Sequence, residues 1–90
     1  MKDKNHGLDE IFERFAACLE RGEKPSGDRA KALTIELQRY ITANFYECTD
    51  ELLMGLGELY SSDERFREHI DKCQKGTAEF VSSAIKSRLG

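Results

Sequence analysis

The sequence predicts an all-α fold, a single small globin-like bundle of four to five helices. Apolar residues recur at the three-and-four spacing of helices, and no stretch alternates apolar and polar residues for long enough to make a strand. The 90 residues, 39% hydrophobic and 34% charged, can enclose one core only. We therefore expect one domain over residues 8–90, preceded by a polar tail over residues 1–7.

Charge and composition exclude several classes of protein. Fourteen basic residues against 17 acidic ones give a net charge of −3, without a basic stripe that could follow a phosphate backbone, so this chain is not expected to contact nucleic acid directly. No apolar run approaches the ~20 residues of a membrane span, and the start lacks the apolar segment of a signal peptide. We expect no membrane contact and a cytoplasmic location.

The first two helices are predicted from amphipathic periodicity. The first should run from Leu8 to just before Gly22, since glycine commonly ends a helix. Its apolar face is formed by Leu8, Ile11, Phe12, Phe15, Cys18 and Leu19. The second should run from about residue 28 to residue 46. Its inward face is formed by Ala30, Leu33, Leu37, Tyr40, Ile41, Asn44 and Phe45.

A third helix is predicted over about residues 50–60, with the Thr49 hydroxyl as its N-cap. The residues expected to be buried are Leu52, Leu53, Leu56, Leu59 and Tyr60. Gly55 and Gly57 lie inside it and cost about 1 kcal/mol each relative to alanine. Close approach of another helix or of a ligand is expected to compensate for both.

The sequence pattern in the last third of the chain predicts two shorter helices. Ser61 and Glu64 form a capping-box pattern that should open a fourth helix. The residues expected on one of its faces are Phe66, Ile70 and Cys73. Gly76 should end it, and a fifth helix is expected over about residues 78–88. Its inward residues are Phe80, Val81, Ala84 and Ile85.

Among the three cysteines, Cys48 has the most interesting position. An odd number of widely separated cysteines predicts free thiols, and Cys18 and Cys73 continue apolar helix faces as small core residues. Cys48 directly precedes a helix N-terminus, where the helix dipole lowers the pKa of a thiol. The acidic residues around it oppose that effect. A reactive thiol and an inert, half-buried one both remain open.

Patterns for metal binding and catalysis are absent from the sequence. His69 and Cys73, four residues apart, are the only pair that suggests a metal or haem ligand, and no second pair accompanies them. There is no nucleophile–base pattern and no glycine-rich phosphate loop. We expect no metal, no cofactor and no enzymatic activity.

The eight aromatic residues could form the core or line a pocket. Aromatic rings give a large contact area, and a tyrosine adds a hydroxyl that can orient a ligand. We expect the five phenylalanines to be mainly structural and the three tyrosines, Tyr40, Tyr46 and Tyr60, to border a cleft.

Four segments together resemble the TipA-S-type antibiotic-recognition domain, the effector-binding part of some MerR-family transcriptional regulators. They are Phe45-Tyr46-Glu47-Cys48-Thr49, Gly55-Leu56-Gly57-Glu58-Leu59-Tyr60, Asp63-Glu64-Arg65-Phe66 and Ala84-Ile85. The resemblance implies a helical domain that binds antibiotics or other bulky, largely apolar molecules in a cleft. It also implies that Cys48 can add to a dehydroamino acid of a ligand. The residues expected to bind the ligand are Cys48, Tyr40, Phe45, Tyr46, Leu56 and Tyr60.

The resulting hypothesis is a non-enzymatic drug-recognition domain of a MerR-type regulator, or a stand-alone form that sequesters drugs. The resemblance assigns DNA binding to an N-terminal domain, and dimerisation to segments, that these 90 residues do not contain. Two alternatives come from other classes. One is a helical protein-interaction module without a ligand, and the other is a thiol redox sensor that depends on Cys48.

Overall fold

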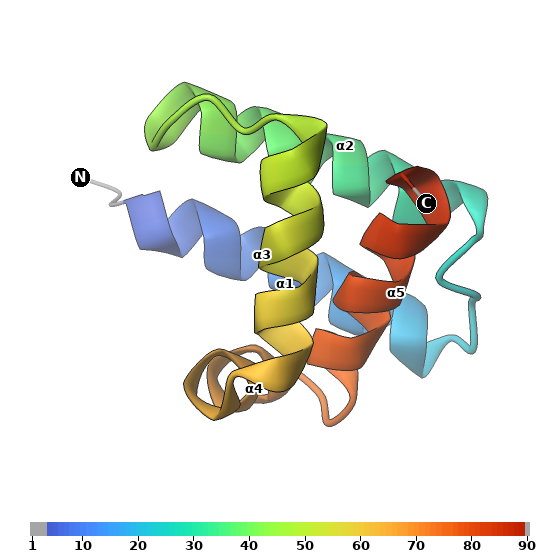
Figure 1. Cartoon of the computed structure of the whole chain (residues 1–90). Coiled ribbons are helices and arrows are strands. Elements are labelled where there is room, and N and C mark those ends of the chain that lie inside the picture. Colours follow the sequence, from blue (N-terminus) through green and yellow to red (C-terminus); the bar gives the residue numbers. More distant parts are fainter. Residues whose placement is uncertain (1–3, 90) are drawn as a thin grey trace.

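The computed structural model describes the backbone of residues 4–89, with side chains from residue 7 onward. This part of the chain forms five helices, and the prediction of an all-α fold is confirmed (Figure 1). The helices are α1 (Lys4–Glu20), α2 (Asp28–Asn44), α3 (Asp50–Ser62), α4 (Glu64–Asp71) and α5 (Thr77–Leu89). None of them is long and apolar enough to cross a membrane.

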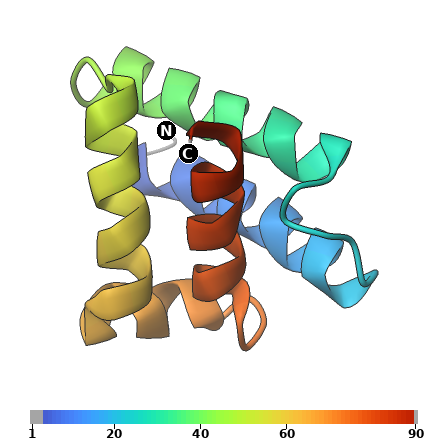
Figure 2. The ribbon, with the colours of Figure 1, turned by 45° about the vertical axis from the view of Figure 1, so that its right-hand side comes forward.

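The helices form two antiparallel pairs that cross each other. α1 lies beside α2, α3 lies beside α5, and α4 runs across one end of the second pair (Figures 1 and 2). The core lies between the pairs. Its largest fully buried side chains are Phe15, Leu37, Leu53, Ile70, Val81 and Ile85. α5 contacts all four of the other helices, so it is the central helix.

α1 begins earlier than the sequence indicated. The helix starts at Lys4 rather than Leu8, so part of the predicted polar tail is helical, and residues 1–3 of that tail lie outside the described residues. Its end agrees with the prediction. Gly22 adopts a φ of +76°, a conformation that glycine reaches without steric cost, and its N–H donates to the Leu19 carbonyl.

α2 ends at Asn44, two residues before the predicted end at Tyr46. The connection to α3, residues 45–49, is tied back to α2 by side chains. Gln38 Nε2 donates to the Cys48 carbonyl at 2.8 Å and to Asp50 Oδ1 at 3.0 Å, and the Cys48 N–H donates to Thr42 Oγ1 at 3.1 Å. The loop is therefore anchored by polar contacts rather than by apolar burial of its aromatic residues.

The start of α3 confirms the predicted cap, because Thr49 Oγ1 accepts from the Leu52 N–H at 3.2 Å. Gly57 also behaves as predicted: a Cβ there would meet the side chain of Ile85 on α5 at 3.2 Å. At Gly55 no other helix approaches, since nothing lies within 4 Å of its missing Cβ. Leu52 was expected inside, but it is 47% exposed because its position on α3 faces away from α5.

The predicted capping box at the start of α4 was wrong. Ser61 and Ser62 belong to the last turn of α3, and both hydroxyls donate to the Glu58 carbonyl. Asp63 caps α4 instead, its Oδ1 accepting from the Arg65 N–H at 2.9 Å. A one-residue junction therefore turns the chain sharply from α3 into α4.

Candidate functional site

An apolar cleft of about 480 Å³ opens between the first half of α1, the end of α3 and one face of α4. Its lining residues are Leu8, Asp9, Phe12, Tyr60, Arg65, Phe66, His69 and Ile70. Phe12, Tyr60 and Ile70 are buried parts of the core and form the floor, while Phe66 is 42% exposed. Because an exposed phenylalanine ring leaves apolar surface in water, a ligand that covers Phe66 gains hydrophobic free energy.

Tyr60 is at the centre of the aromatic wall. Its ring meets Phe12 edge-on, with centroids 5.6 Å apart and planes at 84°, and lies 6.0 Å from Phe66. Such tilted arrangements are the favourable ones for aromatic pairs. Burial raises the pKa of the Tyr60 phenol well above its ordinary range, and charge on Tyr46 or Cys48 would raise it further. The hydroxyl is therefore neutral in the physiological range and can serve as a hydrogen-bond group beside an apolar ligand.

The rim of the cleft carries the charged side chains. His69 Nε2 on α4 lies 2.9 Å from Asp9 Oδ1 on α1, a hydrogen bond between residues 60 positions apart in sequence. This pair joins two helices that otherwise pack mainly on other neighbours. Arg65, also on α4, is the third charged group at the rim.

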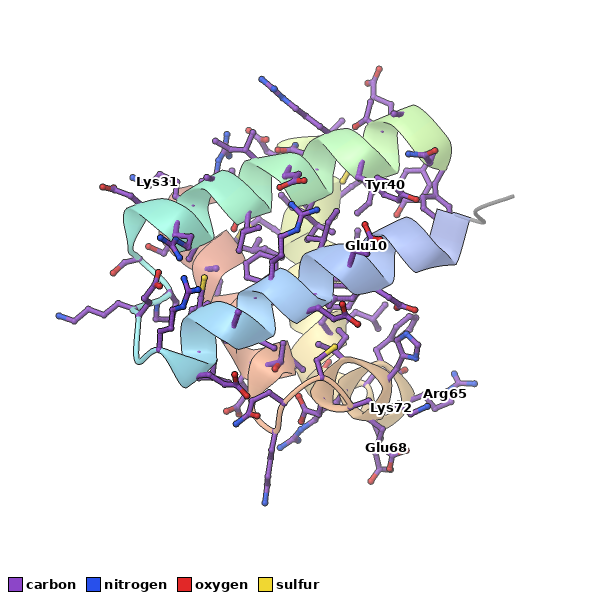
Figure 3. The ribbon with its side chains drawn as sticks, turned by 180° about the vertical axis from the view of Figure 1, so that it is seen from behind. Glu10, Lys31, Tyr40, Arg65, Glu68 and Lys72 are labelled. Atoms are coloured by element: carbon purple, nitrogen blue, oxygen red, sulfur yellow. The ribbon has the colours of Figure 1, made fainter. Side chains whose placement is uncertain are left out.

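The six residues predicted to bind a ligand do not share one pocket. Tyr60 lines the cleft, and Leu56 is partly buried against the core. Tyr40 lies on α2 beside the start of α1, where a Cβ on Gly7 would collide with its ring (Figure 3). Phe45 lies 6.3 Å from the Tyr40 ring, so these two form a separate aromatic pair.

Tyr46 and Cys48 lie in the loop at residues 45–49. Tyr46 is half-exposed, whereas Cys48 is only 4% exposed and borders a second, more polar hollow. That hollow is lined by Ile35, Gln38, Arg39, Thr42, Ala43, Glu47, Cys48 and Arg88. Burial, followed by the charge of Asp50, raises the pKa of the Cys48 thiol. Of the two interpretations that the sequence left open, this direction favours the inert thiol, and it is opposite to that required of a thiol redox sensor.

The predicted division between phenylalanines and tyrosines holds in part. Phe12, Phe15 and Phe80 are buried and Tyr60 lines the cleft, while Phe45 and Phe66 are both 42% exposed. Phe12 and Phe66 were expected to be mainly structural, yet both also line the cleft. One sequence signal could have identified α4 as a wall of the cleft. On this helix of only eight residues, the apolar Phe66 and Ile70 lie directly next to the polar Arg65 and His69.

The described residues offer no metal centre, because no group of three or more potential metal ligands comes together there. The thiols of Cys18, Cys48 and Cys73 are free, which agrees with the sequence-based prediction. The cleft contains aromatic and aliphatic walls with a few polar groups at its edge, an arrangement typical of small-molecule binding sites.

Comparison with known proteins assigns the chain to a class, the helical domains that recognise antibiotics. Residues 1–87 match the family model of the TipAS antibiotic-recognition domain. The chain belongs to the TipAS family, as the resemblance of its four segments indicated.

Relatives and solved structures agree with this assignment. The chain is 36% identical over 77 residues to the HTH-type transcriptional activator TipA of Streptomyces coelicolor and 35% identical over 78 residues to the HTH-type transcriptional activator mta of Bacillus subtilis. These matches cover 86% and 87% of this chain, but the chain spans only 30% of either regulator.

Two solved structures share the fold. TipAS from Streptomyces lividans in complex with nosiheptide matches with a TM-score of 0.85 and 33% identity, over 93% of this chain and 59% of that one. The antibiotic-binding domain of a TipA-class multidrug resistance transcriptional regulator matches with a TM-score of 0.87 and 31% identity, over 99% of this chain and 95% of that one.

Proposed function

We propose that this domain binds a bulky, largely apolar small molecule, such as a thiopeptide antibiotic, in the cleft between α1, α3 and α4, without catalysing a reaction. The observation that carries the proposal is the half-exposed ring of Phe66, which packs on Tyr60 and lines an apolar cavity together with the buried pair of Phe12 and Tyr60. Family membership and the nosiheptide complex of a relative support the class of ligand.

The test compares two phenylalanines that have the same exposed fraction. Phe66 lines the cleft, and Phe45 does not, although both are 42% exposed. Nosiheptide should raise the thermal unfolding temperature of the wild-type domain. Phe66→Ala should weaken nosiheptide binding roughly three- to tenfold, since a ligand covers only the 42% of the side chain that is exposed and full burial is worth about 1.5–3 kcal/mol. Phe45→Ala should leave binding within about twofold.

Equal loss of affinity in both variants, or loss in Phe45→Ala alone, would transfer the ligand site to the loop at residues 45–49. Absence of binding in the wild type, with nosiheptide and with other hydrophobic antibiotics, would favour the interaction module that requires no small molecule. Circular dichroism of each variant shows whether the fold has been kept.

We also propose that Cys48 captures ligands that carry a dehydroamino acid. In this addition the sulfur bonds to the β-carbon of the alkene and the thiol proton is transferred to the α-carbon, so no oxidant is needed. Because Cys48 is buried and its pKa is raised, the loop at residues 45–49 has to open before the thiol can react. Intact-mass analysis after incubation with nosiheptide should show a slow adduct that Cys48→Ser abolishes and Cys73→Ser retains.

For the whole protein we propose a role in a TipA-class transcriptional regulator, where ligand binding here shifts the state of a DNA-binding part. The shift is limited by the difference in affinity of the ligand for the two states. The same cleft in a separate chain would sequester the ligand. Expression of the gene with its flanking sequence, followed by DNA binding measured with and without nosiheptide, separates these two outcomes.

A further inference from the structure

The rim of the cleft carries one cation that is not neutralised at close range. The Arg65 side chain is 91% exposed, and its nearest carboxylate contact in the described part of the chain is Nε to Asp63 Oδ1 at 3.9 Å. That oxygen already accepts the Arg65 N–H as the cap of α4. The two terminal nitrogens of the guanidinium are therefore available at the edge of the cleft.

The carboxylate at the same rim is already engaged. Asp9 Oδ1 lies 2.9 Å from His69 Nε2, so the charge of Asp9 is directed at α4 rather than into the opening. This pairing leaves Arg65 as the charged group that an incoming ligand can engage without breaking an existing short contact.

α4 places its charges asymmetrically. The face toward the cleft carries Arg65 and His69 between the apolar side chains. The carboxylates of α4 line a different hollow, whose residues are Glu64, Arg67, Glu68, Asp71, Lys72 and Lys75. Figure 3 shows Arg65 and Glu68 leaving α4 in different directions. A ligand in the cleft therefore meets the side of this helix that carries Arg65 and none of its carboxylates.

We propose that the cleft prefers ligands that carry an anionic group, a carboxylate or a sulfonate, next to an apolar aromatic body, and that Arg65 recognises that group. The proposal rests on the proposed function, because it assigns a specificity to the same cleft. A guanidinium presents parallel N–H donors that match both oxygens of such an anion. The aromatic body packs on Phe66 while the anion remains at the wet rim.

The attraction has to be local. The chain as a whole carries a charge of −3, so its overall field does not favour an anion. Because Arg65 is exposed, its contribution is modest and is screened by salt.

The experiment uses two probes that share one scaffold. 1-Anilinonaphthalene-8-sulfonate carries a sulfonate, and N-phenyl-1-naphthylamine is the same molecule without it. Fluorescence titration of the wild-type domain at low ionic strength should show roughly three- to fivefold tighter binding of the anionic probe. Arg65→Gln should remove that preference, so that the two probes bind with about equal affinity. High salt should reduce the preference in the same way.

Arg67→Gln is the matched control, because Arg67 is also exposed on α4 but lines the other hollow. It should keep the wild-type preference. Equal affinity for the two probes in the wild type, or a preference that persists in Arg65→Gln, overturns the proposal. Either result leaves the proposed function of the cleft unaffected. If Phe66→Ala weakens neither probe, the cleft is not the binding site and the proposed function falls with it.

Discussion

The cleft and the loop at residues 45–49 both present aromatic side chains, but different forces hold them. The cleft is supported by the core, since Phe12, Tyr60 and Ile70 are buried, and of its aromatic rings only Phe66 is exposed. The loop leaves Phe45 and Tyr46 about half-exposed and is anchored to α2 by hydrogen bonds of Gln38 and Thr42. The difference teaches that an apolar surface is held in place by burial of its base, whereas polar contacts that water can replace leave a loop easier to open.

The largest expected effect comes from the residue at the base of the cleft. Tyr60→Ala removes a buried ring that contacts Phe12 and Phe66, and should lower the free energy of unfolding by about 3 kcal/mol. Tyr60→Phe keeps the ring and should cost much less. Urea denaturation of both variants measures the difference. A small loss in Tyr60→Ala would mean that the cleft does not depend on the core as described.

The loop should respond to loss of its polar anchor. Gln38→Ala removes the contacts to the Cys48 carbonyl and to Asp50, worth about 1 kcal/mol each, so opening should increase roughly 5- to 30-fold. The readout is the alkylation rate of Cys48, followed by peptide mass spectrometry. Cys18, which is buried on α1, is the internal control and should keep its rate. An unchanged rate at Cys48 would show that Gln38 does not hold the loop closed.

The pH dependence of stability connects the two regions. The pKa values of Cys48 in the loop and of Tyr60 in the cleft are both raised by folding. Above about pH 8.5 the unfolded chain loses these protons first, so the stability they contribute is present at neutral pH and declines as the pH rises. Urea midpoints measured from neutral to alkaline pH should fall. The fall should be smaller in Cys48→Ala, while the pKa values of the Cys18 and Cys73 thiols, which burial also raises, keep part of it in place.

The smallest effect is expected at the pair that joins α1 to α4. Asp9→Asn and His69→Gln should each destabilise the domain by less than about 1 kcal/mol, because both side chains are about half-exposed. The double variant should lose less than the sum of the two single losses. Arg14→Gln, which breaks the exposed α1–α2 pair with Glu36, is a comparison of the same kind. Additive losses at Asp9 and His69 would show that the two residues do not act as a pair.

Local signals in the sequence predicted the helices but not the cleft. Periodicity predicted five helical segments, Gly22 ended the first, and Thr49 began the third, because each signal lies within a few residues of its effect. The cleft requires residues near position 9 to meet residues near position 69, and no local pattern encodes that meeting. Phe66 and Phe12 also occupy equivalent positions on apolar helix faces, so periodicity alone could not separate an exposed ring from a core one.

The protonation of Cys48 is a second property that a local sequence pattern could not predict. The place of this residue before α3 favours a lowered thiol pKa and its acidic neighbours oppose that effect, so the sequence left the outcome open. The fold buries the thiol, and desolvation, followed by the charge of neighbouring Asp50, raises the pKa. The sequence identified the residue, while its protonation depends on packing that only the tertiary structure supplies.

The junction between α4 and α5 has a consequence for measurement. Asp71, the last residue of α4, accepts the N–H of Ala78 in the first turn of α5 at 2.9 Å. Any rotation of α4 that widens the cleft has to stretch this bond or pull on the central helix. The NMR chemical shift of the Ala78 amide should therefore change when the cleft widens. It can be followed even for ligands that give no optical signal.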